Sequence, residues 1–162
     1  MESLKKAVKQ LQDFKKGYNQ GIKNSIKIAT ESMYNSVLAN CYSAGISNHT
    51  DAIHWEYDDE TNTGKVWTYD WVIIFNEMGT GVVGSNNPHP NPSPAFQDWV
   101  YDQNEHGERG WKYPKPDGSW GWTSGLPSRH MFYSAFEDIK EDIGEYVKVE
   151  LQKTVGNMYD KE

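Results

Sequence analysis

The chain has 162 residues and a mass of 18.6 kDa, which fits one ordinary domain with a single hydrophobic core. Its formal charge of −7 argues against nucleic acid as the primary ligand, because phosphate binding needs clustered Lys and Arg. A lone cysteine, Cys41, excludes an internal disulfide and argues against a multi-cysteine zinc site. Neither a membrane-spanning run nor the apolar part of a signal peptide is found, so we expect a chain made in the cytoplasm with no membrane partner.

A helical pattern runs through the first forty residues. Apolar side chains recur every three or four positions, at Leu4, Val8, Leu11, Phe14, Tyr18, Ile22, Ile26, Ala29, Met33 and Val37. Gly17 and Gly21 each cost about 1 kcal/mol relative to alanine, so we expect either a bend or two helices in near continuity. The basic residues near the start are typical of a solvated helix face, at Lys5, Lys6, Lys9, Lys15 and Lys16.

Two alternating segments follow, at 53–57 and 66–69, with a turn-rich stretch between them. They predict a β-hairpin, which needs a helix or further strands to be stable in water. Asp70 or Thr68 is then positioned to cap a short helix from Trp71 to Met78. A buried strand is the alternative for that apolar run. The glycines that end it, Gly79 and Gly81, suit a helix C-terminus or a sharp reversal.

Residues 84–126 are rich in proline, glycine and aromatic side chains, and we expect them to form a loop inserted into the domain. Prolines at alternate positions from 88 to 94 predict an extended segment. A Pro-Asp-Gly turn between two aromatic stretches predicts a second small hairpin with Asp117 and Gly118 at its tip. Loops of over forty residues are uncommon in compact domains and usually serve function.

The helical pattern returns from Met131 to Met158, with Pro127 before it and Ser128 as the expected N-cap. Acidic residues early in this helix suit the helix macrodipole, at Glu137, Asp138, Glu141, Asp142 and Glu145. The sequence therefore predicts an α+β fold. Long N-terminal and C-terminal amphipathic helices pack on a small antiparallel sheet, with a short central helix and a long aromatic-rich loop.

The sequence offers little catalytic chemistry. The five histidines have neither HExxH nor HxH spacing, and Gly79-Thr80-Gly81 lacks the lysine of a phosphate-binding loop. Glu105 and Glu108 flank His106 and Gly107, a spacing more typical of solvated charge than of a glycosidase pair. We therefore expect no enzyme activity, no metal and no cofactor.

Three motifs in order resemble the minor tail component family, the tail-completion or head–tail joining proteins of long-tailed bacteriophages. The first is the apolar-Glu-apolar-Gly-Thr-Gly signature, and the last is Arg, Phe and Ala at the start of the final helix. The middle block is similar to a subgroup from phages and prophages of Gram-positive bacteria. The residues that match are Phe75, Glu77, Gly79, Thr80, Gly81, His106, Gly107, Gly110, Trp111, Trp122, Arg129, Phe132 and Ala135. The chain departs from the pattern at His130 and Ser134, where members frequently have proline.

The resemblance implies a non-catalytic protein of the virion neck or tail, made in the host cytoplasm. It further implies a homo-oligomeric ring that contacts the connector, the tail terminator or the tail tube. Candidate interface residues are Lys5, Lys6, Lys9, Trp99, Trp111, Tyr113, Trp120 and Trp122. A carbohydrate-binding or cell-wall-acting module is the alternative, because exposed Trp and Tyr stack on sugar rings. A metal hydrolase using His89, His106 and Glu105 is a third and weaker one.

Overall fold

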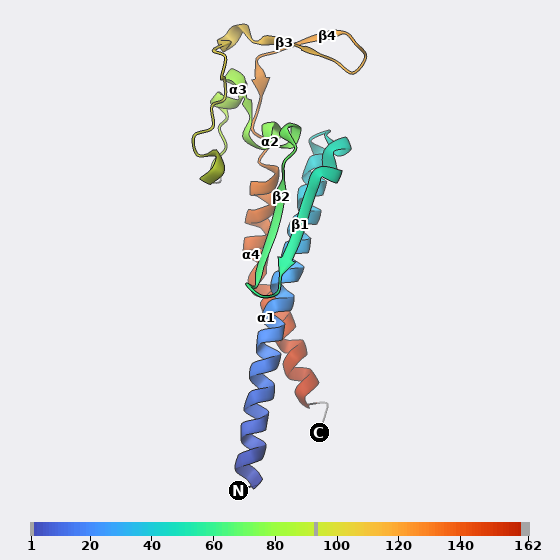
Figure 1. Cartoon of the computed structure of the whole chain (residues 1–162), viewed down its shortest axis with the longest axis vertical. Coiled ribbons are helices and arrows are strands. Elements are labelled where there is room, and N and C mark those ends of the chain that lie inside the picture. The colour runs from blue at the N-terminus through green and yellow to red at the C-terminus, as the bar shows by residue number, and fades with distance from the viewer. Residues whose placement is uncertain (1, 93, 160–162) are drawn as a thin grey trace. The chain divides into compact units, whose positions relative to one another are not determined.

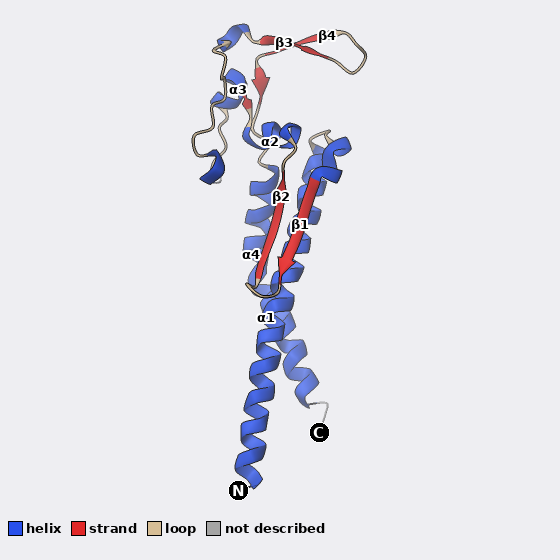
Figure 2. Cartoon of the chain, in the orientation of Figure 1, coloured by secondary structure: helices blue, strands red, loops and turns tan. Residues whose placement is uncertain are grey.

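The computed structural model describes residues 2–92 and 94–159. Helix α1 (Glu2–Ser43) leads through the 3-10 turn η1 (Ser47–Ala52) into strands β1 (Ile53–Asp58) and β2 (Thr63–Thr68), which pair as a two-stranded sheet. Helices α2 (Trp71–Met78) and α3 (Gly81–Asn86) follow. The chain then passes through η2 (Pro94–Phe96), η3 (Gly107–Arg109), strands β3 (Trp111–Pro114), β4 (Trp120–Thr123) and β5 (Gly125–Leu126), and helix α4 (Met131–Tyr159). Figure 2 shows that helices make up more of the chain than strands do.

The predicted fold class is confirmed, with long helices at both ends and small antiparallel sheets between them. The described residues form two compact units. The first contains residues up to 35, 55–66 and from 137 onward, and the second contains 36–54 and 67–136.

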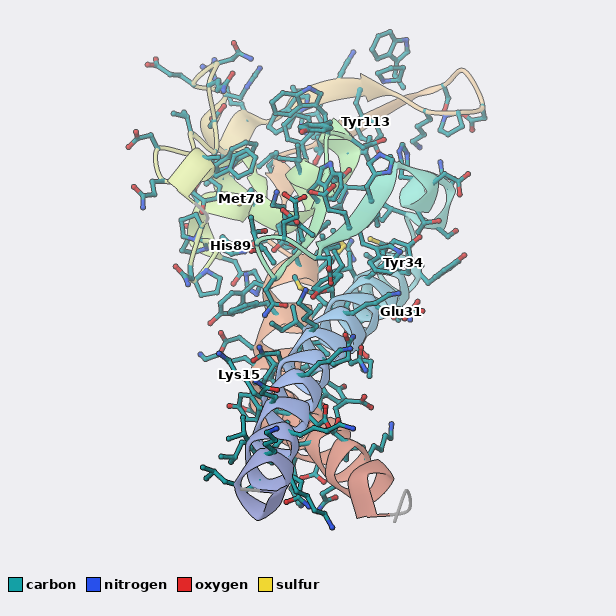
Figure 3. The ribbon with its side chains drawn as sticks, turned by 60° about the horizontal axis from the view of Figure 1, so that its bottom comes forward. Lys15, Glu31, Tyr34, Met78, His89 and Tyr113 are labelled. Carbon is teal, nitrogen blue, oxygen red and sulfur yellow. The ribbon has the colours of Figure 1, made fainter. Side chains whose placement is uncertain are left out.

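The first unit joins α1 to α4 and to the distal part of the β1–β2 hairpin. The Ser25 hydroxyl donates to the Tyr146 carbonyl at 3.3 Å, and the Asn24 amide donates to Glu150 at 3.2 Å. On the hairpin side, the rings of Tyr34 and Trp55 lie 6.3 Å apart. Figure 1 shows the paired strands alongside α1, and Figure 3 labels Tyr34 on the helix.

Two glycines mark where α4 approaches α1. A Cβ at Gly17 would clash with the Thr154 side chain, and one at Gly21 would lie 3.0 Å from Leu151 Cδ2. The alternative of two separate helices is wrong, since α1 runs unbroken through both positions. The glycines are explained by close helix packing, because a larger residue would hold α4 away.

The second unit is built around α2, and its core includes Val37, Cys41, Ile73, Met78 and Met131. The prediction that the run from Trp71 forms a helix is confirmed, and the buried-strand alternative is wrong. The Asp70 carboxylate caps this helix by accepting from the N–H groups of Val72 at 2.7 Å and Ile73 at 3.2 Å. Burial alone would raise the pKa of Asp70, but hydrogen bonds from His49 and these two amides outweigh it and lower the pKa.

The region from 84 to 126 is more ordered than a plain loop. It includes the second half of α3 and the predicted second hairpin, in which β3 pairs antiparallel with β4 and Trp111 faces Thr123. The turn between these strands contains Asp117 and Gly118, as predicted. Helix α3 has no counterpart in the sequence prediction, because a run of Gly, Val, Ser and Asn has weak helical propensity.

The start of α4 differs from its prediction in two ways. The helix begins at Met131, and Ser128 is not its N-cap, because the Ser128 hydroxyl donates instead to the Glu77 carbonyl. The acidic run from Glu137 lies beyond the first turn, so the macrodipole does not account for it. The negative charge at this helix terminus comes from a different part of the chain.

Candidate functional site

The carboxylate of Glu77, on α2, forms the N-terminal cap of α4. Its Oε2 accepts from the Phe132 N–H at 2.9 Å, and its Oε1 accepts from the Tyr133 N–H at 3.0 Å. These amides belong to the first turn of α4, where backbone N–H groups have no acceptor within the helix. The side chain of Glu77 is only 12% exposed, so this charge stabilises the helix terminus at close range. We call Glu77, His89, Ser128, Phe132 and Tyr133 the Glu77 junction.

His89 ties the proline-rich segment to the same carboxylate. Its Nε2 lies 2.9 Å from Glu77 Oε1, while its Nδ1 accepts from the Asn91 N–H at 3.2 Å. Because Nδ1 accepts a hydrogen bond, the ring proton is on Nε2, which donates to Glu77. The side chain is 4% exposed, and its place in the second unit is labelled in Figure 3.

His130 packs against this group in an unusual backbone conformation. Its φ is +53°, in the left-handed region that residues other than glycine rarely adopt. Its ring lies 5.3 Å from the His89 ring, and its buried Nε2 has no hydrogen-bond partner among the described residues. Burial, and then the neighbouring His89, lower the pKa of His130. Proline fixes φ near −65°, so a proline could not occupy this position with the same backbone conformation.

The Gly-Thr-Gly motif reverses the chain beside the junction. Gly79 is the C-cap of α2 with φ of +83°, and its carbonyl accepts from Trp99 Nε1 at 2.9 Å. Gly81 has φ of +61°, and a Cβ there would clash with the Ser124 carbonyl. The Thr80 hydroxyl accepts from the Leu126 N–H at 3.1 Å, and bridges join these two motif residues to β5.

Residues of the third motif meet the first at the backbone. The Arg129 N–H donates to the Asn76 carbonyl at 2.8 Å, while the Arg129 side chain is exposed. Ala135 is fully buried, and Phe132 supplies one amide that Glu77 caps. The first motif and the last are thus parts of one structural junction, with the ring of Phe75 exposed at its edge and lying 5.7 Å from that of Trp71.

The middle block forms its own local structure around Asp102. The carboxylate of Asp102 accepts from the Gly107 N–H at 2.7 Å and lies 3.0 Å from His106 Nδ1. The Gly107 amide and then His106 outweigh burial and lower the pKa of Asp102. The Trp111 ring packs on His106 at 5.0 Å, and Gly110 has φ of +61° where a Cβ would clash with the Thr123 carbonyl.

The candidate interface aromatics divide into two groups. Trp99, Trp111 and Tyr113 make contacts within the fold, since Trp99 packs between Phe75 and Phe96 and Tyr113 covers Gly121. Trp120 and Trp122 are 66% and 61% exposed. Two residues apart on β4, they share one face of the hairpin with Lys112 and Pro114, their partners on β3. Lys5, Lys6 and Lys9 lie on an exposed part of α1.

Both oxygens of Glu77 take part in hydrogen bonds within the fold, two from backbone amides of α4 and one with the His89 ring. Within the ranges 2–92 and 94–159, no group of three or more His, Cys, Asp or Glu side chains is placed to hold a metal ion. His89 and His106 pair with different carboxylates, Glu77 and Asp102, so the hydrolase hypothesis gains no support.

No protein-family model, curated protein or solved structure matches the chain. None of the helices among the described residues is long and apolar enough to cross a membrane.

Sequence reasoning missed His89, His130 and Tyr133 as parts of one cluster. The available signal was Glu77 itself, because a lone carboxylate within a strongly apolar run must be partnered when it is buried. Its partners could not be identified from local spacing, since they follow Glu77 by 12 to 56 positions.

Proposed function

We propose that the chain is a non-catalytic structural protein of a bacteriophage neck or tail that acts in tail completion or head–tail joining. The observation that carries this proposal is the Glu77 junction. There the residues of the family-like signature are used for helix capping and backbone support rather than for chemistry. Such a site holds a scaffold in shape, as an assembly subunit requires.

Exposed apolar surface supports an assembly role. Trp120 and Trp122 on the β3–β4 hairpin, together with Leu4 and Leu11 on α1, are each more than 60% exposed. Trp120 and Trp122 share one face of the hairpin, and clustered exposed apolar residues of this kind mark interaction surfaces in soluble proteins. In a virion these surfaces contact neighbouring copies of the chain and the connector, tail terminator or tail tube.

Deleting the gene from a phage or prophage that carries it tests the proposal. We expect electron microscopy of the lysate to show heads and tails that fail to join, or tails with an incomplete upper end. Joined particles return when wild-type protein is supplied, whereas a Trp120→Ser, Trp122→Ser double variant restores fewer. Normal infectious particles in the absence of the gene exclude this function.

The same two tryptophans support the second candidate, a carbohydrate-binding or cell-wall-acting module. Exposed aromatic rings on one hairpin face can stack on sugar rings. Sedimentation of the purified chain with insoluble peptidoglycan tests this, with the double variant as control. Binding that the variant loses, combined with normal particles from the deletion strain, favours the carbohydrate-binding module.

A further inference from the structure

One continuous apolar stripe on α1 is covered along only part of its length. From Gly21 to Thr30 it packs against α4 and the β1–β2 hairpin, and Gly21, Ser25 and Ala29 are buried. At the same helical spacing, five earlier residues remain exposed: Leu4 (69%), Val8 (46%), Leu11 (70%), Phe14 (47%) and Tyr18 (45%). Figures 1 and 3 both show the first turns of α1 running clear of α4. We call these five residues the α1 stripe.

Helix α4 carries a surface hollow in the same unit. It has a volume of about 560 Å³ and is lined by Gly144, Val147, Lys148, Leu151 and Gln152. A Cβ at Gly144 would meet nothing within 4 Å, so the helix surface is open at this lining residue. A hole of this kind between residues three and four apart on a helix accepts the apolar knob of another helix. We call it the α4 hollow.

The charges near the two surfaces are opposite in sum, and Lys148, which lines the hollow, is paired with Glu145 at 3.0 Å. The segment 4–18 contains five lysines and one aspartate, Asp13. Residues 137–145 of α4 contain five carboxylates and one lysine, Lys140. Glu141 and Glu145 precede the hollow residues Gly144 and Lys148 by three positions, which places them on the same side of the helix. Charges so arranged orient a contact, while the apolar residues supply its affinity.

Leu11, at the centre of the α1 stripe, cannot reach the α4 hollow of its own chain. The two helices are antiparallel, with Gly17 against Thr154 and Ser25 bonded to Tyr146. The hollow residues therefore lie opposite positions after Gly17, whereas Leu11 lies six residues before it, about 9 Å further along the helix axis. A second copy is the occupant that supplies both the matching shape and the matching charge.

We propose that the α1 stripe of one copy packs into the α4 hollow of a second copy, with Leu11 as its central knob. This inference rests on the proposed function, because a ring-forming subunit needs such a contact. The contact joins two different patches, so it is heterologous and closes into a ring when the rotation between copies permits. This contact also gives a role to the acidic residues 137–145 of α4, which the helix macrodipole does not explain.

Sedimentation velocity of the purified full chain, from micromolar to submillimolar concentration, tests the contact. Gly144→Leu fills the hollow from within, and Leu11→Glu places a charge in the stripe. We expect each to weaken self-association roughly tenfold or more while circular dichroism stays unchanged. The matched controls are Gly156→Leu, at an open glycine outside the hollow, and Gln10→Glu, next to the stripe. Both should associate like the wild type.

Cross-linking provides an independent measurement. A Leu11→Cys variant and a Gly144→Cys variant, mixed and treated with a short bismaleimide, should form a covalent pair that contains one of each. The native Cys41 thiol is fully buried and burial raises its pKa to about 11, so it stays unreactive.

A wild-type chain that is monomeric at every concentration overturns the inference, as does association unchanged by both docking variants. If the variants weaken association but the gene deletion leaves normal particles, the proposed function fails and the inference stands. If the deletion stops joining but the variants associate normally, the inference fails and the proposed function stands.

Discussion

Oε2 of Glu77 accepts a hydrogen bond from the Phe132 N–H at 2.9 Å, across a sequence separation of 55 residues. A helix N-terminus is usually capped by the residue just before it. Here the cap comes from a separate helix, and the same carboxylate is also bonded to the His89 ring. One side chain thereby fixes α2, the proline-rich segment and the start of α4 to one another.

Replacing Glu77 tests how much this cap contributes. Glu77→Ala should lower the free energy of unfolding by about 2–4 kcal/mol, because three partly buried donors lose a charged acceptor. Glu77→Gln keeps one acceptor oxygen and should cost less. Urea denaturation measures both, with Glu31→Gln at an exposed position of α1 as the control. If the two Glu77 variants lose no more unfolding free energy than the control, Glu77 does not stabilise the start of α4.

Glycine substitutions should have opposite effects at two positions. Gly81→Ala places a methyl group against the Ser124 carbonyl at φ of +61°, which should cost at least about 2 kcal/mol. Gly144→Ala lies within α4 in open space and should stabilise the chain by about 1 kcal/mol. Thermal melts compare the two. Gly45→Ala, with positive φ and no close neighbour, separates backbone strain from steric clash.

Acidification should weaken the Glu77 junction through His130. Its folded pKa is lowered from 6.5, so the folded state disfavours the protonated ring. Stability from this residue is therefore present above pH 6.5 and is lost as the pH falls below it. Asn tolerates positive φ, so His130→Asn should keep the backbone and flatten the stability profile between pH 7 and 5. An unchanged slope in this variant would assign the pH dependence to other groups.

Hydrogen exchange should separate the scaffold from the aromatic region. The described residues in 87–92 and 94–109 make few regular backbone hydrogen bonds and should exchange orders of magnitude faster than α1 from 21 to 41 in the free protein. Mass spectrometry of peptides from the two regions measures this difference. Uniformly slow exchange would contradict it and would favour a preformed sugar-binding surface.

The features that were predictable from sequence are those set by local spacing. Apolar periodicity gave both long helices, and the stretches around Asp117 and Gly118 gave the second hairpin. The Asp70 cap was predictable because its amides follow within three residues. The Glu77 cap was not predictable, because a helix is normally capped by a local residue such as Ser128. Only the folded chain brings the distant Glu77 carboxylate close to the start of α4. The close packing at Gly17 was not predicted for the same reason, since the residue that it contacts, Thr154, is distant in sequence.

The long sequence separation between Glu77 and the backbone amides that it caps, those of Phe132 and Tyr133, affects how the chain folds during synthesis. Helix α2 is complete before Phe132 and Tyr133 have been added, so on the nascent chain the Glu77 carboxylate must stay hydrated. Burying it earlier would leave a charge without partners. The second unit therefore closes only after the C-terminal helix begins to form, and a ribosome stalled before residue 131 should carry an open, protease-sensitive α2.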